Sequence, residues 1–216
     1  MSQKFKIIRD YYDRGEKIYD KTSVEFKPGL TVLVGCNGSG KTTLLQQIKE
    51  GCKKNKLPVM EFDNYHDGSS SAISYAGFVG DYSKVAKDLC SSEGERISGN
   101  MAMVAGRIGR FVRDNSDAEK LFILLDAIDS GLSVDNVIEL KNDLFSFVIT
   151  DCTDKGIELY FIVSANEYEL ARGEQCFDVS SCKYVSINSY DEYRSVIIET
   201  RKKKSKRYGW EEFKYE

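Results

Sequence analysis

One glycine-rich segment limits what this chain can fold into more than any other part of it. Residues 35–42 read Gly-Cys-Asn-Gly-Ser-Gly-Lys-Thr, which is the pattern Gly-x-x-x-x-Gly-Lys-Thr. An apolar, β-branched run at 31–34 comes directly before the segment and predicts a buried strand. The stretch 43–50 follows it and places its leucines and isoleucine on one helical face. The sequence therefore predicts a strand, a phosphate-binding loop and a helix in that order.

The residue types of this loop suit a polyphosphate. Backbone amides can wrap phosphate oxygens closely only where no side chain obstructs them, and Gly35, Gly38 and Gly40 meet that need. We expect Lys41 to reach the β and γ oxygens of a nucleoside triphosphate, while the Thr42 hydroxyl can bind Mg²⁺. The expected nucleotide contacts of the loop are Asn37, Gly38, Ser39, Gly40, Lys41, Thr42 and Thr43. A glycine-rich turn without function is the alternative, and both flanks argue against it.

Composition narrows the class of protein. The chain has 216 residues, of which 41% are hydrophobic and 30% charged, so we expect one packed domain over 1–216. A formal net charge of −3 argues against a generally basic nucleic-acid-binding protein and leaves room for a local basic patch. The sequence contains no run of 18 apolar residues, and its polar start has no signal-peptide core. We expect a cytoplasmic protein with no membrane partner.

The N-terminal third of the chain predicts a small β part and a loop region. Strands at 5–12 and 23–26 are expected to make the segment 1–34 a small antiparallel β part that leads to the phosphate loop. A further short strand is expected at 59–62. The region 60–90 contains a run rich in glycine and serine, which predicts a mobile loop.

The second half of the chain alternates strands with helices. Continuous apolar runs at 121–125, which ends in Asp126, and at 159–164 are typical of strands buried on both faces of a parallel sheet. A helix is expected between them at 134–151. Its inward-facing residues are expected to be Val137, Leu140, Leu144, Phe147 and Val148. This alternation predicts an α/β fold, a parallel sheet flanked by helices, with the small antiparallel part added.

Two further helices are expected to begin at capping boxes. Ser92–Glu95 opens a helix whose apolar residues recur at helical spacing, and Ser189–Glu192 opens the last helix. The C-terminal segment 189–216 then carries a basic run at 201–207 and an aromatic tail. The run can be a solvated helix end whose cations complement the helix dipole, or a contact with nucleic-acid phosphates. The acidity of the chain favours the first interpretation.

With these parts in order, the chain resembles an ABC-type ATPase of the soluble branch that includes SMC and RecF proteins. Residues 23–45 resemble the strand, turn and Asn-Gly-Ser-Gly-Lys loop of that branch. Residues 91–96, Ser-Ser-Glu-Gly-Glu-Arg, are similar to its signature motif. Residues 121–133 resemble its Walker B strand and following loop, and the strand at 159–164 leads to Asn166, near the position of the family's switch histidine.

The resemblance implies a P-loop NTPase fold and a set of site residues. It implies ATP and Mg²⁺ as ligands, with Thr42 and Asp126 as metal ligands and with Lys41, Asp126 and Asn166 as the catalytic set. It also implies an ATP-dependent homodimer, arranged head to tail. In such a dimer, the loop of one copy would face the signature residues Ser92, Gly94 and Glu95 of the other.

The sequence departs from the family pattern at two positions. Ala127 stands where such enzymes carry the glutamate that positions and deprotonates the attacking water. General-base assistance is typically worth about 10² to 10⁴ in rate, so we expect slow hydrolysis. Asp129 is a candidate substitute, but its matched position normally serves the dimer loop, and we rank it below loss of the base. Asn166 in place of histidine removes a polar partner of the γ-phosphate, although its amide can still donate a hydrogen bond.

Two functions from different classes remain open at this point. The first is an ATPase that acts as a nucleotide-gated clamp or switch in nucleic-acid metabolism or genome defence, by analogy with the family. The second is a nucleotide-sensing interaction module in which ATP is a structural ligand. The partner would be a nucleic acid or a protein. The interval between Lys41 and Ser92 is short and has no heptad pattern, so no coiled-coil arm and no transporter subunit are expected.

Overall fold

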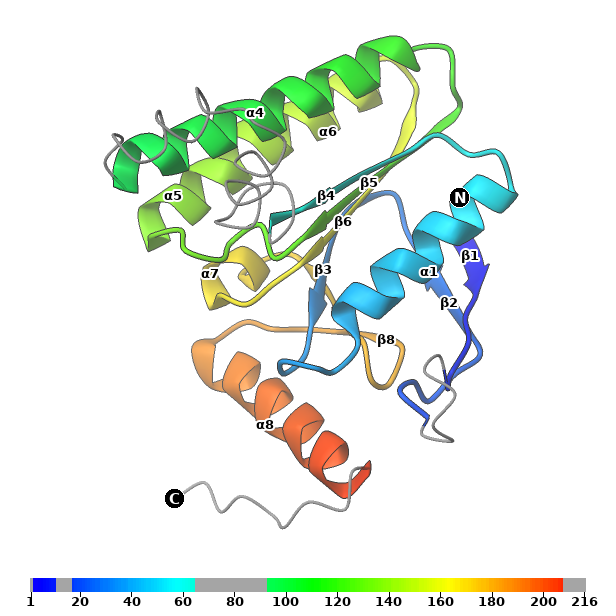
Figure 1. Ribbon diagram of the computed structural model, residues 1–216, viewed down its shortest axis with the longest axis vertical. Coiled ribbons are helices and arrows are strands. Elements are labelled where there is room, and N and C mark those ends of the chain that lie inside the picture. The colour runs from blue at the N-terminus through cyan, green and yellow to red at the C-terminus, as the bar shows by residue number, and fades with distance from the viewer. Residues whose placement is uncertain (1, 11–16, 65–92, 208–216) are drawn as a thin grey trace, which may run out of the picture.

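A six-stranded, mostly parallel sheet forms the centre of the protein (Figure 1). The computed structural model describes residues 2–10, 17–64 and 93–207. The strand order is β4 (Val59–Asp63), β5 (Lys120–Asp126), β6 (Glu158–Ser164), β3 (Gly29–Val34), β7 (Gln175–Asp178) and β8 (Lys183–Val185). Neighbouring strands are parallel except β7 and β8, which form an antiparallel edge. The expected α/β fold is confirmed, and the β7–β8 edge is an addition that the sequence does not predict.

Alternate residues of the central strands pack into two different cores. On β5, Leu121, Ile123 and Leu125 face one core, whereas Phe122 and Leu124 face the other. The first core is covered by helices α4 (Glu93–Asp114), α5 (Val134–Glu139) and α6 (Ser146–Asp154). The second is covered by α1 (Lys41–Lys54) and by a two-stranded sheet of β1 (Gln3–Lys6) and β2 (Ser23–Phe26). Burial on both faces explains why these strands are continuously apolar.

The expected antiparallel part at the N-terminus is present in a shorter form. Strands β1 and β2 pair antiparallel, with Gln3 opposite Phe26 and Lys6 opposite Ser23. The strand expected at 5–12 thus ends at Lys6, and residues 11–16 lie outside the described part of the chain. Most of the loop region expected at 60–90 also lies outside the described part, because residues 65–92 are not described. Its first residues belong to β4.

The helix expected at 134–151 is interrupted by a π-helical segment, η2 (Leu140–Phe145), between α5 and α6. The prediction that Phe147 faces inward is wrong, because its side chain is 70% exposed. Phe145 is fully buried in its place, five residues after the buried Leu140. A π turn closes hydrogen bonds from i to i+5, so it moves the buried face later by one residue compared with an α-helix.

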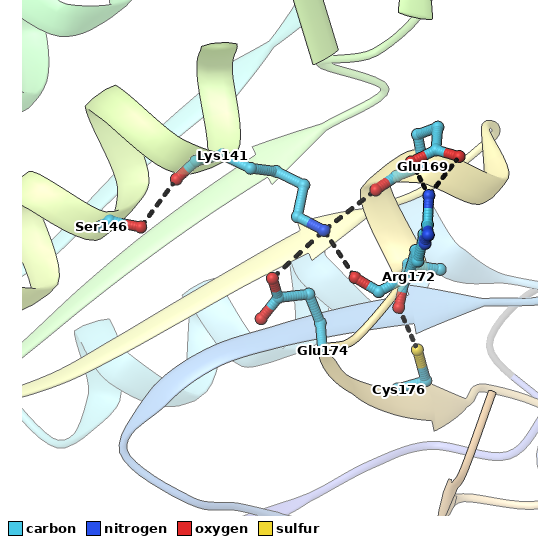
Figure 2. Close-up of polar contacts among 7 residues, drawn as sticks. Lys141, Ser146, Glu169, Arg172, Glu174 and Cys176 are labelled. Atoms are coloured by element: carbon cyan, nitrogen blue, oxygen red, sulfur yellow. Dashed lines mark hydrogen bonds and ion pairs between the residues drawn. The ribbon is translucent and has the colours of Figure 1, made fainter. Parts of the chain in front are cut away.

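Lys141 of this π segment holds the turn that leads from α7 (Tyr168–Ala171) to β7 (Figure 2). Its ammonium donates to the carbonyl oxygen of Glu169 at 3.0 Å and to that of Arg172 at 2.6 Å. It also forms an ion pair with Glu174 at 3.2 Å. Cations suit the unsatisfied carbonyls at the end of a helix. The contact fixes the segment that follows β6 against the helical layer.

The last helix, α8 (Tyr190–Arg207), begins where the capping box was expected, with the Ser189 half of the box formed and the Glu192 side chain bonded one residue earlier than expected. The backbone amide of Glu192 donates to Ser189 Oγ at 3.2 Å, and the Glu192 carboxylate accepts from the amide of Asn188 at 2.6 Å. The helix lies beyond the carboxyl ends of the central strands, next to the loop between β3 and α1 (Figure 1). Within the described part of the chain, no helix is long and apolar enough to cross a membrane.

Candidate functional site

The loop between β3 and α1 has a backbone that only glycine fits at several positions. Gly35, Gly38 and Gly40 have φ angles of 144°, 74° and 102°. A Cβ atom on Gly35 would lie 2.7 Å from Ser39 Oγ, and one on Gly40 would lie 2.6 Å from Ile18 Cγ2. Both distances are shorter than van der Waals contact. The glycines therefore permit both the unusual backbone angles and the close approach of neighbouring atoms.

Lys41 opens α1 at the base of this loop and is almost fully buried. Its ammonium donates a hydrogen bond to the carbonyl oxygen of Gly35 at 2.8 Å, across the loop. Burial lowers the pKa of Lys41 because the charged form loses hydration. The nearby Cys36 thiol and the carboxylates of Asp126 and Asp129 oppose this shift. The structure thus brings the loop lysine close to both acidic residues at the end of β5.

The end of β5 is joined to the phosphate-loop strand through the strand between them. Because β6 lies between β3 and β5, its last residue, Ser164, lies next to the end of β5. Ser164 Oγ donates to Asp126 Oδ1 and accepts from the backbone amide of Ala127 at 2.8 Å. Asp126 is buried. Nothing in its own segment marks Ser164, because strand order alone places it there.

Asp129 lies in a separate hydrogen-bond network after β5. One of its oxygens accepts from the backbone amides of Asn166 and Glu167 at 2.7 and 2.8 Å, and the other accepts from the Asn166 side chain at 3.3 Å. The Asn166 amide also donates to Ser130 Oγ at 2.9 Å. Burial raises the pKa of Asp129, and the backbone hydrogen bonds from Glu167 and Asn166 oppose that shift. Asp129 therefore orders the loop after β6.

The loop surface is divided between exposed and buried groups. Asn37, Gly38 and Thr42 are exposed, whereas Ser39 is buried. Among the described residues, Ser39 Oγ has no hydrogen-bond partner, which is unusual for a buried hydroxyl. Thr43, in the first turn of α1, is also buried. An exposed loop backbone next to a buried lysine fits a bound polyphosphate.

A cavity of about 410 Å³ lies beside the loop. Its walls come from the first loop residues, the segment after β6 and α8. The lining residues are Gly35, Cys36, Asn37, Asn166, Glu167, Tyr190, Tyr193, Arg194 and Ile197. No sequence pattern predicts that α8 forms part of this cavity wall, since the feature that the sequence shows in α8 is the basic run at 201–207.

The start of α4, which carries the expected signature residues Gly94 and Glu95, lies apart from the loop of the same copy. Ser92 is outside the described residues, and Gly94 belongs to the first turn of α4. Glu95 is in the same turn, where its side chain is not described. Figure 1 shows this end of α4 well separated from the phosphate loop. One copy of the described chain therefore does not bring the two predicted parts of the site together.

Comparison with known proteins gives one family. A family model described as an AAA domain matches residues 14–213. No curated protein matches the chain.

Similar solved structures include a DNA replication initiation factor and two structures of DnaA. A DNA replication initiation factor shares 16% identity over 85% of this chain and 46% of its own, with a TM-score of 0.35. The replication initiator DnaA bound to AMPPCP and single-stranded DNA shares 16% identity over 86% of this chain and 47% of its own, with a TM-score of 0.35. AMPPCP-bound DnaA from Aquifex aeolicus shares 16% identity over 88% of this chain and 48% of its own, also with a TM-score of 0.35. The chain spans about half the length of each.

Proposed function

Because this chain belongs to the AAA domain family of P-loop ATPases, which agrees with its resemblance to SMC- and RecF-like proteins, we propose that it binds Mg·ATP and dimerises around it. Two copies would meet head to tail, with the loop of one facing the start of α4 of the other. Hydrolysis would be slow. The dimer would act as a nucleotide-gated clamp or switch, in nucleic-acid metabolism or genome defence by family analogy.

The observation that carries the proposal is the seat of Lys41. Its ammonium donates to the Gly35 carbonyl oxygen beneath a loop of three glycines with positive φ angles. Burial lowers the pKa of Lys41, and the nearby Asp126 carboxylate opposes that shift. In this arrangement the loop amides bind phosphate oxygens, and Lys41 turns from the Gly35 carbonyl toward them.

Thr42 and Asp126 are the residues that would hold Mg²⁺. Magnesium usually takes only one or two protein ligands besides water and phosphate oxygens, so this pair suffices. The bound ion would neutralise charge on the phosphates. Ser164 orients the Asp126 carboxylate through its hydroxyl.

Slow hydrolysis is supported by what surrounds Ala127. A methyl side chain cannot accept a proton. Asp126 accepts a hydrogen bond from Ser164, and both oxygens of Asp129 accept hydrogen bonds from the segment after β6. The Asn166 amide donates to Asp129 and Ser130, so it would have to leave them to reach a phosphate. The chain therefore has the groups for binding a nucleotide, while general-base assistance is weak.

A second candidate function follows from the same residue. If Ala127 abolishes turnover, ATP would serve as a structural ligand that orders a surface for another protein. The rate of phosphate release separates this interaction module from a slow ATPase.

Binding of Mg·ATP to the Lys41→Ala variant tests the proposal. We expect the parent chain to bind ATP and the variant to show no measurable binding, with an unchanged circular dichroism spectrum. Isothermal titration calorimetry measures both. Lys53→Ala is the matched control, because Lys53 is exposed in the last turn of the same helix. Near-normal affinity in a folded Lys41→Ala protein would contradict the phosphate-loop assignment.

A further inference from the structure

One face of the C-terminal helix α8 lies directly on the phosphate loop. Thr200, Lys204 and Arg207 are four and three residues apart, which places them on one side of a helix. The backbone amide of Cys36 donates to Thr200 Oγ1 at 2.9 Å, and Lys204 Nζ donates to the carbonyl oxygen of Asn37 at 3.0 Å. Segments more than 160 residues apart in the sequence thus share hydrogen bonds at the candidate site.

The Lys204 ammonium lies against Gly38. A Cβ atom added to Gly38 would lie 2.4 Å from Lys204 Nζ and 3.1 Å from its Cε atom. Gly38 is one of the exposed residues whose amides are expected to face phosphate. A second ammonium group, besides that of Lys41, is therefore in contact with the loop. It comes from the basic run, in which Lys202 and Lys206 are exposed and, each two residues from Lys204, belong to another side of the helix.

The same helix also holds the segment that supports the other side of the loop. Arg207 donates to the carbonyl oxygen of Ile18 at 2.8 Å, and Lys203 is 3.8 Å from the Asp20 carboxylate. Tyr19 lies between Ile18 and Asp20 in the sequence, and its hydroxyl donates to the carbonyl oxygen of Gly40 at 2.9 Å. The loop is therefore held at Cys36–Gly38 and at Gly40 by one connected set of contacts that depends on α8.

We propose that Lys204 is a second phosphate-binding lysine of the nucleotide site and that α8 docks more firmly on the loop when a nucleoside triphosphate is bound. This inference rests on the proposed function. An ammonium next to Gly38 attracts phosphate oxygens, and a hydrogen bond to a charged group is stronger than one to a carbonyl. Thr200 is a positioning residue, since it fixes the Cys36 amide and with it the start of the loop.

Binding at the loop and docking of the helix must then strengthen each other equally. Anything that favours the docked helix raises the affinity for the triphosphate, and the triphosphate favours the docked helix by the same factor. A helix that packs on the loop for structural reasons alone would not respond to the nucleotide.

Calorimetry with Mg·ATP on three variants tests the role of Lys204. We expect Lys204→Gln, which keeps most of the side-chain length but loses the charge, to bind ATP about tenfold more weakly than the parent chain. Lys204→Arg should recover most of the affinity. Lys202→Gln is the matched control on the exposed side of α8 and should bind as the parent does. An unchanged melting temperature without nucleotide excludes a general loss of fold.

Hydrogen exchange measures the coupling. ATP should slow exchange of the α8 amides in the parent chain, and this protection should be lost in Lys204→Gln. Equal ATP affinity of Lys204→Gln and the parent would overturn the inference, and so would exchange rates of the α8 amides that do not change when ATP is added. Either result would leave the proposed function in place. A parent chain that binds no ATP would overturn the proposed function itself.

Discussion

At the scale of single residues, Ala127 combines an unusual backbone with a missing functional group. Its φ angle is 51°, in the left-handed region that residues other than glycine seldom adopt. Its amide donates to Ser164 Oγ, and its carbonyl oxygen accepts from the Asn64 side chain at 3.1 Å. The surrounding contacts therefore hold this conformation, which would cost about 1 kcal/mol or more in isolation.

We predict that Ala127→Glu raises the rate of ATP hydrolysis at least tenfold, which is within the typical worth of a general base. The backbone contacts of position 127 do not involve its methyl group, so the variant should keep the fold. Steady-state phosphate release is the measurement. Ala127→Gln is the control, since it has the same size and cannot deprotonate water. Rapid hydrolysis by the parent chain would instead indicate that Asp129 or Asn166 assists the reaction in place of the missing glutamate.

At the scale of elements, the π segment η2 decides which phenylalanine stabilises the helical layer. Phe145 is fully buried, and its ring centroid lies 4.6 Å from that of Phe161 on β6. Phe147 is 70% exposed. An uninterrupted α-helix would exchange these roles, because it would have no residue shift after Leu140.

We expect Phe145→Ala to lower the free energy of unfolding by about 3 to 5 kcal/mol, as is typical for a buried aromatic side chain. Phe147→Ala should change it by less than about 0.5 kcal/mol, because an exposed side chain loses little packing. Urea denaturation followed by circular dichroism measures both variants, and each serves as the control for the other. A larger loss for Phe147→Ala than for Phe145→Ala would show that the helix between β5 and β6 is regular.

At the scale of the whole molecule, the separation of α4 from the loop bears on assembly. The first turn of α4, which carries the expected signature residue Gly94, lies away from the loop of its own copy (Figure 1). If both parts bind one nucleotide, they must come from two copies. A head-to-tail pair would supply two such composite sites.

We predict that ATP drives dimerisation and ADP does not, because only the γ-phosphate offers the α4 terminus of a second copy a group to bind. Slow turnover should make the ATP dimer long-lived. Ser92→Arg should block it through bulk and misplaced charge without weakening ATP binding by the monomer. Light scattering on the parent protein and on Ser92→Arg, each with ATP and with ADP, measures the mass in solution. A mass that does not depend on the nucleotide would show that Ser92–Glu95 is only a helix cap.

The sequence by itself determined the parts of this protein that depend on neighbours along the chain. The glycine pattern with its flanking strand and helix, the two continuously apolar strands and the Ser189–Glu192 cap all appear in the structure close to where they were expected. Each of these features repeats over a few residues or needs a particular residue at one backbone position. Such features can be recognised before the fold is known.

Only the tertiary structure decided what meets at the site. Strand order placed Ser164 beside Asp126, and the loop after β6 gave Asp129 its partners in Asn166 and Glu167. Docking of α8 brought Lys204 to Gly38. These contacts join segments from 37 to more than 160 residues apart, and no local pattern encodes the distance between them. The π segment belongs here as well, because periodicity alone predicts a regular helix, whereas the buried positions follow the π turn.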